Sequence, residues 1–78
     1  MTKIDPLTST GYAYVQIADI LAARIRVGQY ASKLPSERDL AAEFGVSYQT
    51  LRHAMAVLRE RGLIITRQGW GTFIRDQR

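Results

Sequence analysis

A very short junction between two helical segments constrains the fold of this chain more than any other feature. The first segment begins at Ser36 and ends at Gly45, and the second begins at Ser47 and ends at Gly62. A serine side chain can cap the start of a helix, and glycine adopts the left-handed conformation that ends one. Apolar residues recur in both segments with helical spacing, and these are Leu40, Phe44, Leu51, Ala54, Met55 and Leu58. Two short helices joined by such a tight turn are typical of a helix-turn-helix unit.

The residues before this unit predict a first helix and a short strand. One apolar helical stripe ends near Gly28, and its members are Tyr14, Ile17, Ala18, Leu21 and Ile25. Ile20 lies off this stripe, so we expect it to be exposed. We expect Tyr12, Tyr14 and Tyr30 at the edge of the core. Residues 30–34 are too few for a helix before the proline at position 35, which favours an extended backbone before it, so this segment predicts a short strand.

After Gly62 the spacing of apolar residues changes from the period of a helix to that of a strand. Residues 63–67 and 72–74 are rich in β-branched side chains, and the four residues between them include two glycines. Two such runs around a glycine-rich turn predict a β-hairpin. The sequence therefore predicts a mainly α-helical fold with a small β-hairpin, a winged helix-turn-helix. We expect helices near residues 12–27, 37–44 and 48–61 and the wing hairpin from about 63 to 75.

Composition excludes several classes of protein. The chain has 78 residues, enough for one domain, and its 46% hydrophobic and 23% charged residues are typical of a globular chain. It has no cysteine and one histidine, so we expect no disulfide, no metal site and no cofactor. It has neither a signal-peptide core nor an 18-residue apolar run, so we expect no membrane segment. We divide the chain into a flexible arm at 1–11, one domain at 12–75 and a tail at 76–78.

The positive charge is concentrated in the last third of the chain. The formal net charge is +4; residues 1–51 carry five basic and five acidic side chains, whereas residues 52–78 carry six basic and two acidic ones. Nine of the eleven basic residues are arginine, which binds phosphate and guanine edges with two parallel hydrogen bonds. This pattern has two interpretations, which are solubility and an anionic polymer as partner.

The outward face of the third helix has the polarity that DNA recognition requires. With the apolar stripe turned inward, four residues point outward, namely Gln49, Arg52, His53 and Ala56. Small and polar side chains allow the start of a helix to approach a base-pair edge. The hydroxyl groups of Ser47 and Thr50 and the first backbone N–H groups of the helix can bind a phosphate. His53 has no second metal ligand in the sequence, so we interpret it as a passive surface residue.

Five segments of the sequence together resemble the DNA-binding domain of GntR-type bacterial transcription regulators. They read LPSERDLA at 34–41, FGVS at 44–47, TLR at 50–52, LRERGLI at 58–64 and GWGTFI at 69–74. The resemblance covers roughly residues 12–75 and implies a bacterial cytoplasmic regulator, at the nucleoid, that binds a pseudo-palindromic double-stranded operator as a homodimer. Its C-terminal domain normally senses a metabolite and carries the dimer interface. These 78 residues contain no such domain, so we expect an isolated DNA-binding domain that is monomeric or weakly dimeric.

The resemblance also implies which residues contact DNA. It implies that the recognition helix lies in the major groove and that the wing enters the minor groove. The implied contacts are Arg38 in the second helix, Ser47, Tyr48, Gln49, Thr50 and Arg52 in the third, and Gly69 at the wing tip. Arg67 and Arg75 flank the wing, where phosphate contact and simple solvation are equally compatible with the sequence. For Arg38 we favour a DNA contact over an ion pair with Glu37 or Asp39.

Two positions depart from the family pattern. Tyr48 stands where the family usually has an arginine, and Trp70 stands where it has arginine or lysine. Each change removes a cation from the expected interface. Tyr48 has two alternative roles, contact with a thymine methyl group and donation to a phosphate. Trp70 also has two, packing back onto the hairpin and contact with DNA, and of these we favour packing.

Three classes of function remain at this point. We favour sequence-specific DNA binding by a transcriptional regulator, more often a repressor than an activator. The alternative is a winged helix that binds proteins and never contacts nucleic acid, but the polar and basic face of the third helix argues against it. An enzyme is excluded because the sequence has no carboxylate pair, phosphate loop or nucleophile with a partner base.

Overall fold

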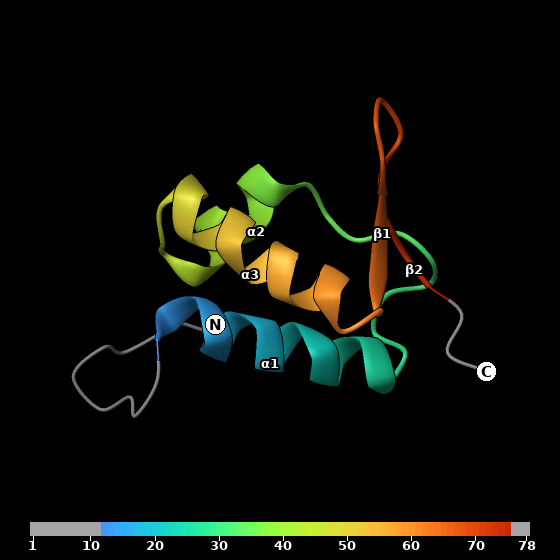
Figure 1. The fold of residues 1–78 in the computed structure, drawn as a ribbon, viewed down its shortest axis with the longest axis horizontal. Helices are drawn as coiled ribbons and strands as arrows, with labels where there is room; N and C mark the ends of the chain where they lie inside the picture. The colour runs from blue at the N-terminus through green and yellow to red at the C-terminus, as the bar shows by residue number, and fades with distance from the viewer. Residues whose placement is uncertain (1–11, 76–78) are drawn as a thin grey trace.

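The computed structural model describes residues 12–75, and the predicted arm at 1–11 and tail at 76–78 lie outside these described residues. Three helices are followed by a two-stranded antiparallel hairpin (Figure 1). The elements are α1 (Ala13–Arg26), α2 (Glu37–Phe44), α3 (Tyr48–Glu60), β1 (Ile64–Arg67) and β2 (Gly71–Ile74). The predicted winged helix-turn-helix is therefore confirmed, with each helix within one residue of its expected bounds.

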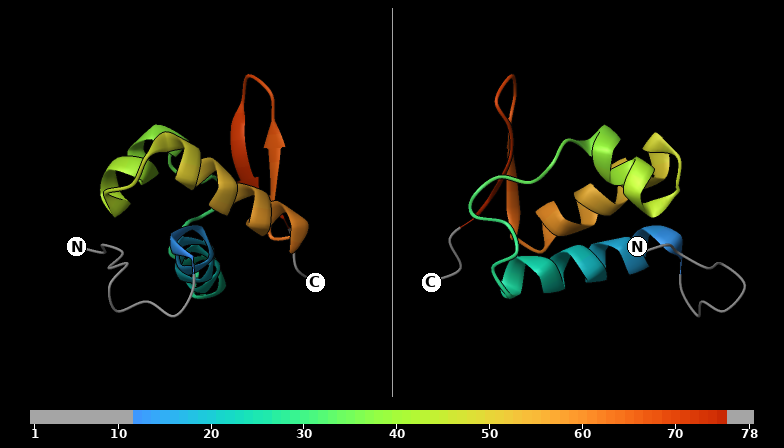
Figure 2. Two further views of the ribbon diagram at one scale, coloured as in Figure 1. Left: turned by 60° about the vertical axis from the view of Figure 1, so that its left-hand side comes forward. Right: turned by 180° about the vertical axis from the view of Figure 1, so that it is seen from behind.

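The helices pack in two layers, and the hairpin projects from one end of them. Helix α1 lies beneath α3, α2 lies beside the start of α3, and the hairpin rises from the end of α3 away from α1 (Figures 1 and 2). The core between the layers contains the predicted stripes of all three helices. Its largest fully buried side chains are Ile17, Leu21, Leu40, Phe44, Leu51, Met55, Leu58 and Ile64. These contacts fix α2 and α3 relative to each other.

The turn between α2 and α3 forms as its residues predict. The Ser36 and Ser47 side chains each accept a hydrogen bond of 3.1 Å from a backbone N–H three residues later. Gly45 ends α2 with φ of 68°, in the left-handed region where glycine is favoured. Both helices therefore begin on capping serines, and only three residues, 45–47, separate them.

Two expectations about the first half of the chain are corrected. The short strand expected at 30–34 is reduced to one bridge between Lys33 and Phe73. Beside this bridge the backbone N–H of Leu34 donates to the Thr72 carbonyl, and the backbone N–H of Ile74 donates to the Ser32 carbonyl. The strand extends no further because Pro35 has no N–H and the chain must turn away to begin α2. Ile20 is half-buried against the core rather than exposed, because the buried stripe of a globular helix is wider than its central row.

One ion pair joins α1 to α2 beside the core. The Arg24 guanidinium binds the Glu43 carboxylate and donates a 2.9 Å hydrogen bond to the Tyr30 hydroxyl. It also lies over the Phe44 ring, 5.2 Å from its centroid. The hydrogen bond from Arg24 lowers the pKa of Glu43 below its usual value of 4.5. This pair therefore favours the charged form of Glu43 in the folded state.

A carboxylate whose pKa is lowered by folding stabilises the protein above the unfolded-state pKa, and this stabilisation is lost as the pH falls through the folded-state pKa. We therefore expect Glu43→Gln to lower the free energy of unfolding near neutral pH by up to about 1 kcal/mol, a small effect because solvent screens a partly exposed pair. The difference from wild type should shrink as the pH falls below 4.5. Urea unfolding followed by circular dichroism across this range measures it.

The matched control is Glu60→Gln, at an exposed position in the last turn of α3. It should leave the free energy of unfolding nearly unchanged at every pH. An effect of Glu43→Gln that is the same at pH 3 and pH 7 would show that packing, and not the ion pair, is responsible.

Candidate nucleic-acid interface

The start of α2, the start of α3 and the wing converge on one side of the molecule, the upper side in Figure 1. A cleft of about 530 Å³ lies between them. It is lined by residues of the α2 cap, of the first turn of α3 and of both wing strands. Four predicted site residues meet there, and these are Arg38, Tyr48, Arg67 and Gly69.

A smaller hollow of about 300 Å³ follows the outward face of α3. Its lining includes the four residues expected to point outward, Gln49, Arg52, His53 and Ala56. Arg52 is largely exposed, and Glu37 and Arg59 complete the hollow. The predicted orientation of α3 is therefore confirmed.

Glu37 connects the cleft to the hollow, and the sequence pattern did not place it in the site. Its carboxylate accepts a 3.1 Å hydrogen bond from the Tyr48 hydroxyl, and the same oxygen lies 4.0 Å from Nε of Arg52. The Arg52 guanidinium lies 5.8 Å from the centroid of the Tyr48 ring. Glu37 thus faces α3 and contacts both Tyr48 and Arg52. The only sequence signal for this arrangement was an acidic residue at the start of α2.

The two hydroxyl residues at the start of α3 have different hydrogen-bonding capacity. Ser47 Oγ accepts from the Thr50 backbone and donates to Thr50 Oγ1 over 3.0 Å, so its hydroxyl is engaged in the cap. Thr50 Oγ1 accepts this bond and retains its own hydroxyl hydrogen as a donor. Of the two predicted phosphate ligands, Thr50 has the side-chain donor left to offer.

The wing tip holds Trp70 in an exposed position. The strand ladder ends at the pair Arg67 and Gly71. The backbone N–H of Trp70 closes the turn by donating a 2.9 Å hydrogen bond to the Arg67 carbonyl. Trp70 is 71% exposed. The interpretation that it packs back onto the hairpin is therefore wrong, because a two-stranded hairpin has no further layer at its tip to receive the ring.

Lys33 is a third cation of the cleft beside Arg38 and Arg67, and the sequence pattern did not place it there. Its side chain crosses Gly71, where the Cβ atom of any larger residue would come within 2.6 Å of Lys33 Cε. Its ammonium lies 5.8 Å from the centroid of the Phe73 ring. The bridge between Lys33 and Phe73 brings this side chain to the wing, a tertiary contact that no local pattern indicates.

The single histidine is held by aromatic stacking. Its ring lies parallel to that of Tyr14 at a centroid distance of 3.8 Å, and Tyr14 in turn stacks on Tyr12 at 5.8 Å. Tyr14 and Tyr30 are half-buried at the edge of the core as expected, but Tyr12 is 73% exposed. Among residues 12–75 no group of three or more acidic or histidine side chains could hold a metal ion.

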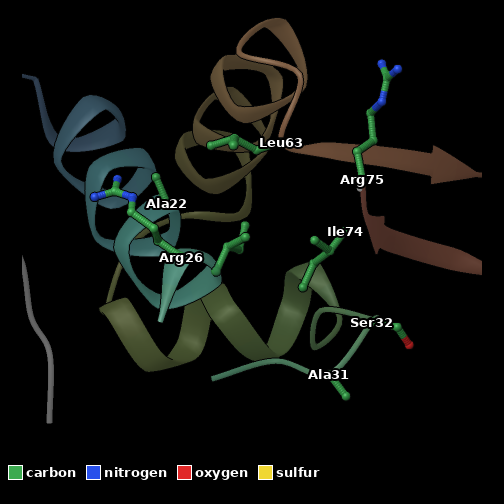
Figure 3. A pocket seen from close by; sticks show the side chains of 8 residues that line it. Ala22, Arg26, Ala31, Ser32, Leu63, Ile74 and Arg75 are labelled. Carbon is green, nitrogen blue, oxygen red and sulfur yellow. The ribbon is translucent and has the colours of Figure 1, made fainter. Parts of the chain in front are cut away.

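Arg75 lies at the opposite end of the hairpin from Arg67. It borders a separate groove of about 590 Å³ between the end of α1 and the base of the hairpin, shown in Figure 3. The groove has an apolar lining from Ala22, Ile25, Leu63 and Ile74. Arg75 is therefore remote from the cleft at the wing tip, and of the two flanking arginines only Arg67 lines it.

Within residues 12–75, no helix combines the length and the apolar character needed to cross a bilayer. This finding agrees with the absence of a long apolar run in the sequence.

Comparison with protein families identifies the domain. Residues 13–74 match the model of the family described as bacterial regulatory proteins, gntR family. The chain is 44% identical over 64 residues to the HTH-type transcriptional regulator SmoD of Agrobacterium fabrum, covering 80% of this chain and 27% of SmoD. It is 40% identical over 63 residues to the HTH-type transcriptional repressor NagR of Bacillus subtilis, covering 78% and 26% of the two chains. The chain thus spans about a quarter of the length of these curated relatives.

Solved structures show the same fold. The DNA-binding domain of AraR, crystallised in complex with operator ORE1, has a TM-score of 0.86 and 32% identity, covering 96% of this chain and 99% of that one. The possible transcriptional regulator YydK of Bacillus subtilis has a TM-score of 0.79 and 31% identity, covering 87% and 31%. The match to a family of bacterial regulatory proteins agrees with the expectation that this domain is a regulator and not an enzyme. The chain belongs to the GntR family of transcriptional regulators and corresponds to its winged helix-turn-helix DNA-binding domain.

Proposed function

We propose that this domain recognises a pseudo-palindromic operator in double-stranded DNA, with the start of α3 in the major groove and the wing tip in the minor groove. In this proposal residues 12–75 form the DNA-binding domain of a bacterial cytoplasmic repressor whose effector domain is not part of the sequence. The observation that carries the proposal is the convergence of two helix starts and the wing tip on one cation-rich side. Five basic residues line the cleft and the hollow, against one carboxylate, and they are Lys33, Arg38, Arg52, Arg59 and Arg67.

The proposed contacts divide into base readers and phosphate binders. Arg38 extends from the first turn of α2 into the cleft and reads a guanine edge, whereas Gln49 reads an adenine edge from the first turn of α3. Arg52, Arg67 and the Thr50 hydroxyl bind phosphates. Helix starts favour anions because their first N–H groups point outward.

The other predicted contacts follow from the same placement. The Tyr48 ring is half-exposed and its hydroxyl is engaged by Glu37, which favours contact with a thymine methyl group over donation to phosphate. Ser47 acts through its cap and backbone, Gly69 allows close approach of the wing backbone, and Trp70 enters the minor groove. The AraR domain, crystallised in complex with an operator, supports operator DNA as the ligand.

Titration of dye-labelled duplex DNA followed by anisotropy tests the proposal. Random duplex should bind at low salt and dissociate as salt rises, because binding releases counterions from the phosphates. Selection from a random DNA pool should then enrich one half-site sequence. Absence of binding at low salt would contradict the proposal and favour the protein-interaction alternative.

The isolated domain should be monomeric or only weakly dimeric in solution. Among residues 12–75 the exposed large apolar side chains belong to both ends of α1, the start of α3, β1 and the wing turn, and they are Tyr12, Val27, Tyr48, Ile65 and Trp70. Sedimentation velocity at micromolar concentration should show a monomer, and two copies should occupy one palindrome. Each half-site should bind much more weakly than a linked dimer would, because linkage raises the effective concentration of the second domain. A tight dimer without DNA would contradict this expectation.

A further inference from the structure

The wing tip presents an aromatic ring where the domain approaches DNA in the proposed function, on which this inference rests. Trp70 lies between Gly69 and Gly71, whose φ values are 83° and 120°. Together with Arg67, Gln68 and Phe73 it lines an open hollow on the wing. The ring is thus carried on a tight turn and is largely exposed.

The chemistry of the indole group selects what this tip can bind. Between the two glycines it supplies no cation, so an ionic contact with phosphate is lost at this position. A planar apolar ring gains free energy by stacking on a base, and apolar side chains that enter the minor groove partly unstack a base step. The indole group carries one N–H donor and no acceptor atom. It therefore matches the acceptors that A·T pairs present in the minor groove and opposes the amino group of guanine.

We propose that Trp70 is a stacking wedge: its indole ring inserts from the minor groove at a TA step in the operator and partly unstacks it. TA steps are the natural site because they are flexible and easily unstacked. The wing then selects a deformable A·T-containing step by shape and apolar contact. Arg67, at the end of β1, supplies the adjacent phosphate contact.

The protein itself carries the probe for this proposal, because Trp70 is its only tryptophan. The ligand is the duplex enriched from the random pool, with 2-aminopurine replacing each adenine of one half-site in turn. Binding is followed by the anisotropy of a dye at the duplex end, independently of Trp70. When the protein is saturated with this duplex, stacking of the indole ring on a base should quench the Trp70 emission severalfold. Unstacking of the TA step should increase the fluorescence of 2-aminopurine placed there. If the anisotropy of the dye does not change, the domain does not bind this DNA, and the proposed function itself is contradicted.

Substitutions at the tip separate stacking from charge. Trp70→Ala should weaken binding about five- to tenfold on the TA-containing duplex and much less on one with a stiff A-tract at that step. Trp70→Phe should retain most of the affinity. Trp70→Arg should lose the preference for TA and increase the salt slope by about one. Gln68→Ala, at the same turn, is the matched control and should leave the preference intact.

Two results would overturn the wedge while leaving DNA binding in place. One is an anisotropy change at saturation with unchanged Trp70 emission, which means that the ring remains in solvent. The other is quenching of Trp70 without brightening at any 2-aminopurine position, which means that the ring contacts the backbone and unstacks nothing.

Discussion

Arg38→Ala is expected to relax sequence preference as well as lower affinity. A bidentate contact from arginine to guanine contributes about 1–3 kcal/mol of discrimination, so the ratio of operator to scrambled-duplex affinity should fall roughly 5- to 150-fold. The side chain is exposed in the first turn of α2 and lines the cleft between the helices and the wing.

Arg52→Ala should behave differently. Arg52 lies one turn into α3 on the flank of the helix, near the carboxylate of Glu37, and we assign it to a phosphate. Its loss should weaken binding to all sequences nearly equally and reduce the salt slope by about one. The ratio of operator to scrambled affinity should change little.

Binding of each variant to both duplexes across a salt series distinguishes these roles. Arg26→Ala is the control, because this cation lines the groove on the far side of the molecule. Arg26→Ala should change neither the ratio of operator to scrambled affinity nor the salt slope of binding appreciably. If Arg38→Ala leaves the ratio unchanged while Arg52→Ala collapses it, the two assignments are reversed.

Phe44→Ala should remove a large part of the free energy of unfolding of the domain. The Phe44 ring is 1% exposed at the junction of α2 with the other helices, and the guanidinium of Arg24 covers it. Such a truncation costs about 3–5 kcal/mol, because the surrounding helices cannot close the cavity. A domain of this size has a total stability of only about 4–12 kcal/mol.

Urea unfolding monitored by circular dichroism measures this loss. Phe73→Ala is the control, since this ring is only half-buried on the wing and should lose distinctly less stability. A loss below about 1 kcal/mol for Phe44→Ala would mean that α2 is not held by the core that the structure shows.

The parts of the fold that could be predicted from the sequence are those set by local chemistry. Ser36 and Ser47 cap their own helices, Gly45 ends α2, and the change of apolar period after Gly62 marks the hairpin. The outward face of α3 follows from the same helical period. Each of these features depends on residues within a few positions of one another.

The contacts that could not be predicted join residues that are distant in the sequence. Glu37 has charged neighbours in its own helix, yet its carboxylate turns to Tyr48 on another helix. Lys33 reaches the wing through one bridge, and Trp70 is exposed because the hairpin has no layer above its tip. The tertiary arrangement decides these three positions, and all of them lie on the side of the domain that faces DNA in the proposed function.

The small size of the hairpin has a kinetic consequence. Four residue pairs and one bridge hold it, and so short a two-stranded sheet is marginally stable in water. It therefore opens locally at a lower free energy than the helices, whose core is fully packed. In the proposed function the rigid helices and their cations govern how fast the domain finds a site. The wing, settling afterwards into the minor groove, governs how long the domain stays there.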